Sequence, residues 1–189
     1  MLSLFTGILL YQRFSEYELS VLLSVLHQGG KKVIYIGLDD QVVKGEAGLP
    51  CIPETTIQDV DLELLDSIVL PGVDDFEHLV GHKGLSDFLV RANDNKRVIA
   101  AISSAPYFLS MSGLLAEKKF TTGLTAEQRD FLGTFKEDNY MDTQVVVDDT
   151  IVTAKGAAFI EFAFAFGDRM QLNYQKEWYR WAGLGPLGP

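Results

Sequence analysis

The stretch "VIAAISSAPYFLSMSGL", residues 98–114, decides the fold class of this chain. An apolar run, Val98 to Ile102, passes through two adjacent serines into an apolar segment that ends at Gly113. Pro106 suits the first turn of a helix, where a missing N–H costs nothing. A buried strand that turns tightly into a helix is typical of open α/β sheets, which bind ligands at the carboxyl ends of their strands.

The same alternation of strand-like and helical segments continues along the chain. Apolar runs of strand length alternate with segments of helical period, so we expect an α/β fold with a mostly parallel central sheet buried on both faces. The expected strands are 3–11, 31–38, 67–72, 98–102 and 120–123, and the expected helices are 15–28, 59–66, 85–92, 125–133 and 157–170. Two further segments, 42–53 and 142–156, are expected to form a small β-hairpin arm and a β-hairpin.

Length and composition predict a single domain over residues 1–189, because 189 residues with 47% hydrophobic content bury one good core. The aromatic segment after Glu177 is expected to dock through Trp178 and Trp181 before a flexible tail, 182–189. The apolar start, residues 1–11, lacks a basic leader and a cleavage site, so we interpret it as the first buried strand.

The net charge and the cysteine content limit the classes of binding partner and the cellular compartment that we expect for this protein. The formal net charge is −10, so the surface field repels nucleic acid and anionic membranes, and we expect neither as a partner. The single cysteine, Cys51, excludes an intramolecular disulfide, which is typical of a protein of the reducing cytoplasm. We therefore expect a cytoplasmic protein.

Ser103 has two interpretations. On a sharp turn between strand and helix it would resemble a nucleophile elbow, although the G-x-S-x-G motif is absent, and the helix N-terminus would offer N–H groups to an anion. Alternatively, Ser103 or Ser104 is an ordinary N-cap residue with no further role. From this stretch alone both interpretations stay open.

The two histidines at His78 and His82 are the other candidates for chemistry. Their spacing is that of the zinc motif H-E-x-x-H, but the glutamate and a third ligand are missing, so we expect no metal and no cofactor. Because both follow the Pro71–Gly72 turn, either one could instead reach Ser103 and serve as its base.

Four segments together resemble the ThiJ/PfpI superfamily, the class I glutamine-amidotransferase-like group that includes the Parkinson-disease protein deglycase and the PfpI-type intracellular proteases. They are "FSEYELSVLLSVLHQGGKKVIYIGL" (14–38), "IVLPGV" (68–73), "AAISSAP" (100–106) and "IVTAKGAAFIEFAFAF" (151–166). The resemblance implies a flavodoxin-like three-layer sandwich and a homodimer. It places the nucleophilic cysteine of the family on Ser103 and its buried glutamate on Glu18.

The same resemblance implies an oxyanion or anion site made by the amides of the Gly72–Val73 turn and of Ser104. Departures from the family pattern fall on the reactive groups. The thiol is replaced by a hydroxyl, and the two histidine positions of the family hold Ser104 and Gly123. Glu18 is poorly matched as a base for an alcohol, and Ser15-x-x-Glu18 has the alternative of a helix capping box.

These observations favour a scaffold that binds a small metabolite or an anionic group over Ser103 without the thiol chemistry of the family. A first alternative is a serine-dependent hydrolase or amidase in which Glu18, His78 or His82 assists Ser103. A second alternative is a dimeric interaction protein that docks a partner through its aromatic C-terminal segment.

Overall fold

The computed structural model describes residues 4–93 and 96–179, and its centre is a seven-stranded sheet in the order β5-β2-β1-β6-β7-β9-β8. All neighbouring strands are parallel except β8 and β9, which form the predicted hairpin. The strands are β1 Phe5–Leu10, β2 Lys32–Gly37, β5 Thr55–Thr56, β6 Leu65–Leu70, β7 Val98–Ile102, β8 Val145–Asp148 and β9 Ile151–Ala154. The central strands read as near-continuous apolar runs because both faces of the sheet are covered.

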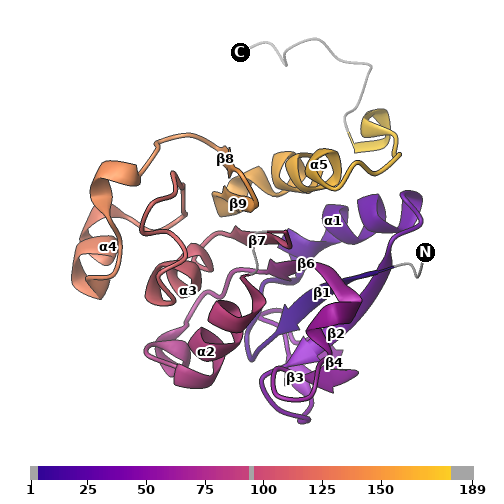
Figure 1. Ribbon diagram of the computed structural model, residues 1–189, viewed down its shortest axis with the longest axis horizontal. Coiled ribbons are helices and arrows are strands. Elements are labelled where there is room, and N and C mark those ends of the chain that lie inside the picture. Colours follow the sequence, from indigo (N-terminus) through magenta and orange to yellow (C-terminus); the bar gives the residue numbers. More distant parts are fainter. Residues whose placement is uncertain (1–3, 94–95, 180–189) are drawn as a thin grey trace.

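Helices cover the sheet on both sides (Figure 1). Helices α1 (Glu16–Gln28) and α5 (Phe159–Arg169) pack together on one face, and α2 (Lys83–Ala92) and α3 (Pro106–Met111) lie on the other. A further helix, α4 (Ala126–Leu132), lies at the end of the molecule beside α3 and starts with the capping box that the sequence predicts. The predicted three-layer, flavodoxin-like α/β fold is therefore confirmed.

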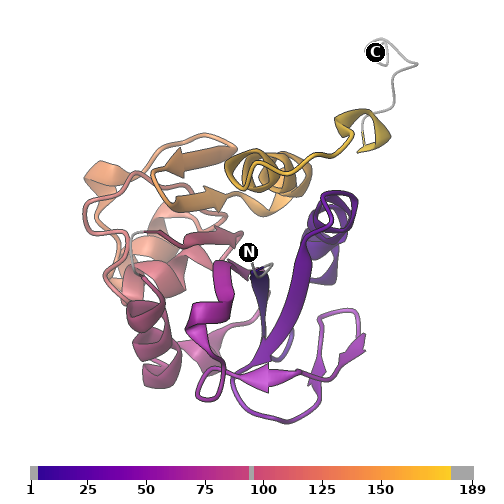
Figure 2. The same ribbon diagram turned by 45° about the vertical axis from the view of Figure 1, so that its right-hand side comes forward.

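The predicted arm is a separate two-stranded sheet of β3 (Val43–Lys44) and β4 (Pro50–Cys51), which stands away from the main sheet in Figure 2. The Glu16 carboxylate at the start of α1 accepts hydrogen bonds from the N–H groups of Ala47 and Leu49. These bonds fasten the tip of the arm to the helix that carries Glu18.

Three short elements differ from the prediction. Strand β5 extends the sheet at its edge and was not predicted, the expected helix 59–66 is a single 3-10 turn at Leu62–Leu64, and the expected strand 120–123 is a single bridge from Phe120 to Tyr140. Segments of two to four residues have only a weak intrinsic preference for helix or strand. Their conformation therefore depends on the neighbouring strands against which they pack.

The C-terminal segment docks in a different way from the one expected. Trp178 is 73% exposed, so the prediction that the segment docks through this residue is wrong, and the neighbouring Tyr179 packs against the core instead. The Tyr179 hydroxyl donates to Ser24 and accepts from Gln28 on α1. Trp181 and the tail 182–189 lie outside the described residues. Within the described part of the chain, each helix is too short or too polar to cross a membrane.

Candidate functional site

Ser103 lies immediately after β7 in a left-handed backbone conformation, with φ of +65°. This conformation costs a residue with a side chain about 1–2 kcal/mol. It is held by three hydrogen bonds: the Ser103 N–H donates to Ala154, and the Ser103 carbonyl accepts from Gly123 N–H and the Thr122 hydroxyl. The N-cap residue of α3 is Ala105, so neither serine is the N-cap residue. A strained residue that its surroundings hold this firmly is typical of a functional position.

Glu18 projects from the first turn of α1 toward Ser103 and is 1% exposed. Its Oε2 atom accepts from the N–H of Gly72 at 2.6 Å, and its Oε1 atom accepts from the Tyr17 hydroxyl at 3.3 Å. Ser15 makes no side-chain capping bond and donates to Glu46 instead, so the capping-box alternative does not hold. The carboxyl group of Glu18 therefore belongs to the site.

The environment of Glu18 raises the pKa of its carboxyl group. Burial is the largest cause, because it removes water from the charged form, and it outweighs the hydrogen bonds from Gly72, Ser103 and Tyr17, which lower the pKa. The Glu18 carboxyl group is therefore easier to protonate than that of an exposed glutamate.

Two glycines allow the backbone to approach this pair closely. A Cβ atom at Gly156 would lie 2.9 Å from both Ser103 Oγ and Glu18 Oε1, and one at Gly72 would lie 2.6 Å from Glu18 Oε2. Gly156 was not singled out in the sequence, although a glycine at the end of a strand is a signal for close backbone approach. Together these glycines shape the wall around the Ser103 and Glu18 side chains.

Ser104 has a different role from Ser103. Its buried hydroxyl accepts from the N–H of Val73 at 2.9 Å and donates to the carbonyl of Val73 at 2.8 Å, which ties the 71–73 turn to the elbow. Two of the three N–H groups expected at an anion site, those of Gly72 and Val73, are therefore engaged within the protein. Among the described residues, the N–H of Ser104 has no acceptor.

The space over Ser103 is a cavity of about 280 Å³. Its charged lining residues are acidic, namely Glu18, Glu46 and Asp74, and the described part of the lining holds no basic side chain. Tyr17 forms part of the wall. An anion entering this cavity would meet like charges, so the lining disfavours the anionic ligand that we expected.

The two histidines lie elsewhere. His78 and His82 line a different cavity, with Tyr11 and Asp39 at the ends of β1 and β2, and this cavity shares no lining residue with the one over Ser103. The Nδ1 atom of His82 accepts from the N–H of Leu85 at 3.0 Å and caps α2. The structure does not bring either imidazole to Ser103.

No three His, Cys, Asp or Glu side chains of the described residues are arranged to hold a metal ion. The position next to Ser103 at which deglycase-like proteins have a histidine is occupied by the exposed Gly123. A Cβ atom there would lie 3.3 Å from Ser103 Cα, so this position borders the elbow directly.

A family model described as "DJ-1/PfpI family" matches residues 7–168 of this chain. The chain belongs to the DJ-1/PfpI family. The similarity to the ThiJ/PfpI superfamily predicted from the sequence is thus confirmed.

The proteins that resemble this chain are named after different activities. It is 29% identical over 157 residues to the "Glutathione-independent glyoxalase DJR-1.2" of Caenorhabditis elegans, with 82% of each chain covered. It is 23% identical over 182 residues to the "Uncharacterized protease YoaZ" of Bacillus subtilis, with 90% of this chain and 86% of YoaZ covered. Family membership therefore leaves the activity of this protein open.

The fold is also that of solved members of the family. A DJ-1 superfamily protein of Agrobacterium tumefaciens superposes with a TM-score of 0.80 at 25% identity, covering 93% of this chain and 94% of that one. The site described above thus lies on the common scaffold of the family, with a chemistry set by its own side chains.

Proposed function

We propose that the protein is a cytoplasmic, small-molecule-binding member of the DJ-1/PfpI family that does not carry out the thiol chemistry associated with the family. The observation that carries this proposal is the environment of Ser103. Its hydroxyl lies against the buried Glu18 carboxyl, and no imidazole of the described residues lines its cavity.

A serine hydroxyl is a weak acid and becomes a nucleophile only when a neighbouring base accepts its proton. Glu18 already accepts hydrogen bonds from Gly72 and Tyr17, and a carboxylate is poorly matched as a base for an alcohol even when burial raises its pKa. Gly123 supplies no side chain where a histidine would stand. These features support binding without covalent catalysis.

The lining of the cavity indicates the polarity of the ligand. With Glu46 and Asp74 at its walls, the cavity favours an uncharged or cationic molecule over an anionic one. The unengaged N–H of Ser104 and the hydroxyl of Ser103 are donors that suit a carbonyl or hydroxyl oxygen. We therefore propose a small polar ligand without net negative charge.

A serine-dependent hydrolase or amidase is the second candidate, and one observation favours it. Ser103 is held in the strained conformation of a nucleophile elbow, which a binding protein does not require. This function demands that a carboxylate accept the proton of Ser103, since no imidazole lines the described part of the cavity, and Glu18 is the carboxyl group that hydrogen-bonds with Ser103.

A fluorophosphonate probe separates the two candidates. We expect intact-mass measurement to show no adduct on the wild type or on Ser103→Ala after prolonged incubation. An adduct on the wild type that is absent from Ser103→Ala would establish an active serine and overturn the proposal.

Ligand binding is tested by ligand-observed NMR with small amides, alcohols, amines and carboxylates. We expect amides, alcohols or amines to bind and Tyr17→Ala to weaken them, because Tyr17 lines the cavity. Trp178→Ala is the matched control, since it removes an exposed aromatic ring outside the cavity. Binding limited to carboxylates, or unchanged by Tyr17→Ala, would contradict this assignment.

We also propose that the protein is a homodimer. Exposed apolar side chains gather on the arm, where Val42, Leu49 and Ile52 are 49%, 54% and 74% exposed. A patch of this kind favours burial against a second protein surface. Sedimentation velocity is expected to show a dimer for the wild type and a monomer for Ile52→Glu, and a monomeric wild type would refute the proposal.

A further inference from the structure

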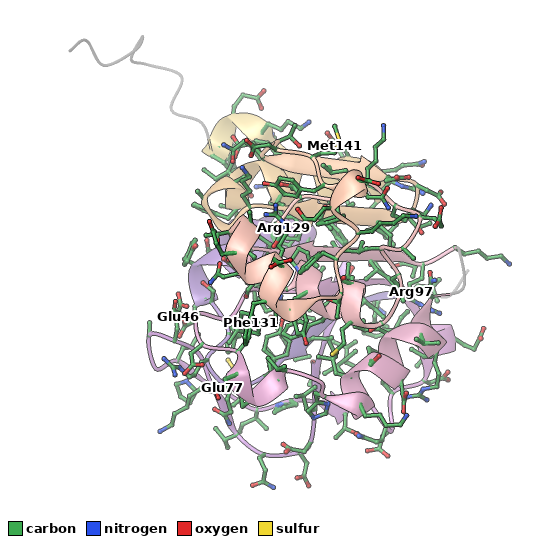
Figure 3. The ribbon with its side chains drawn as sticks, turned by 90° about the vertical axis from the view of Figure 1, so that its left-hand side faces the viewer. Glu46, Glu77, Arg97, Arg129, Phe131 and Met141 are labelled. Carbon is green, nitrogen blue, oxygen red and sulfur yellow. The ribbon has the colours of Figure 1, made fainter. Side chains whose placement is uncertain are left out.

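A second hollow lies beside the Ser103 cavity, between α4 and the 3-10 turn Glu77–Leu79. Its volume is about 350 Å³, and its apolar lining consists of Phe76, Val80, Phe131 and Leu132. Figure 3 shows Phe131 below the α4 ribbon, on the side toward Glu77. We call this hollow the Phe131 groove.

The side chains of the Phe131 groove are more exposed than their chemistry favours. Phe131 is 89% exposed and Val80 is 48% exposed, although burial of either side chain is favourable. Leu132 and Phe76 are partly buried and pack against the core, so they form a fixed base under the exposed Phe131 ring. A preformed apolar groove with an exposed aromatic ring at its edge resembles the anchor sites of protein interfaces.

The rim of the Phe131 groove is acidic. Asp74, Asp75 and Glu77 line it, and all three are exposed. Arg13 pairs with Asp75 at 2.6 Å, which leaves Asp74 and Glu77 as the negative charges without a close cationic neighbour among the described side chains. The whole chain adds a formal net charge of −10. The groove and its surroundings are therefore complementary to a partner that is apolar at its centre and positively charged beside it.

We propose that the Phe131 groove docks a basic peptide segment of another protein, with one large apolar side chain in the groove and a lysine or arginine next to it. The apolar side chain contacts Phe131 and Leu132, and the neighbouring cation lies at Asp74. This proposal goes beyond small-molecule binding and does not depend on any reaction of Ser103.

Asp74 sets the side of the Phe131 groove on which the cation of the docked segment lies. It lines both the Phe131 groove and the cavity over Ser103, where Glu18 and Glu46 add further negative charge. A basic residue next to the apolar anchor thus lies beside the Ser103 cavity. A second basic residue in the same segment extends into the field of Glu46.

Fluorescence anisotropy with a labelled peptide tests the proposal. The probe is an amidated hexapeptide with one phenylalanine followed by two lysines, and the comparison peptides replace the phenylalanine by serine or both lysines by glutamate. We expect only the basic, phenylalanine-containing peptide to bind. Phe131→Ala should weaken it about tenfold, and Asp74→Asn about threefold, with a smaller effect at high salt.

Two matched variants control for exposed aromatic area and for charge. Trp178→Ala removes another exposed aromatic ring, and Glu127→Gln removes a charge of α4 outside the groove, so both should bind as the wild type does. Equal binding of the acidic peptide, no binding of the basic peptide, or no effect of Phe131→Ala would overturn the proposal. So would sedimentation data in which Phe131→Ala abolishes self-association, because a second copy would then occupy the groove.

Discussion

The substitution Gly156→Ala tests whether Ser103 and Glu18 share one tightly packed site. The added Cβ atom would lie 2.9 Å from both Ser103 Oγ and Glu18 Oε1, about 0.5 Å inside the ordinary contact limit of 3.4 Å. Neither side chain can move away easily, because the Ser103 backbone is held by three hydrogen bonds and Glu18 is 1% exposed.

Overpacking of this kind costs about 1–3 kcal/mol. For a chain of this size we therefore expect the melting temperature to fall by about 2–12 °C. Urea unfolding should show a lower midpoint with an unchanged slope, since the surface exposed on unfolding stays the same. Gly84→Ala in α2 is the control, because the contacts of its Cβ atom would be longer, 3.3 Å to His82 Cε1 and 3.7 Å to Ile57 Cδ1, so it should cost less than Gly156→Ala.

A double-mutant cycle identifies the atom responsible. Ser103→Ala removes one of the two oxygens that crowd the new methyl group, so Gly156→Ala should cost at least about 0.5 kcal/mol less in that background. Equal free-energy losses in both backgrounds, or no loss in the wild type, would refute the placement of Ser103 Oγ beside Glu18.

Three further substitutions test the site and its surroundings. The folded state raises the pKa of Glu18 above its ordinary value of 4.5, so the wild type loses stability as the pH rises above that value. The free energy of unfolding of Glu18→Gln relative to wild type should therefore increase as the pH rises through and above 4.5. A difference that does not change with pH would contradict the raised pKa. Ser104→Ala should lower the free energy of unfolding by about 1–3 kcal/mol in urea, because it leaves the buried N–H and carbonyl of Val73 without their partner; a neutral effect would show that water replaces the hydroxyl. His82→Ala should cost about 1 kcal/mol as a lost N-cap and leave ligand binding at Ser103 unchanged in NMR titrations, so a loss of binding would argue against separate cavities.

Local patterns in the sequence were sufficient for the architecture. The apolar runs of β1, β6 and β7, the helical period of 15–28 and the tight turn at Ser103 each report burial or backbone geometry within a few neighbouring residues. Family motifs spread over the chain added the order of these units. The stretch alone left Ser103 open between an elbow and an N-cap residue, and the family resemblance favoured the elbow before any tertiary contact was known.

Tertiary structure alone decided what surrounds that elbow. From the sequence, Glu18 could cap its own helix or face Ser103. A hydrogen bond from the N–H of Gly72, which is 54 residues away, holds its carboxyl group toward Ser103. The two histidines follow the same turn as Val73, yet they line a different cavity. Hydrogen-bond partners and cavity walls come from segments distant in sequence, whose approach depends on how the layers pack. A residue pattern does not record that packing, so the sequence by itself determined the scaffold and the elbow, while the folded chain determined their chemistry.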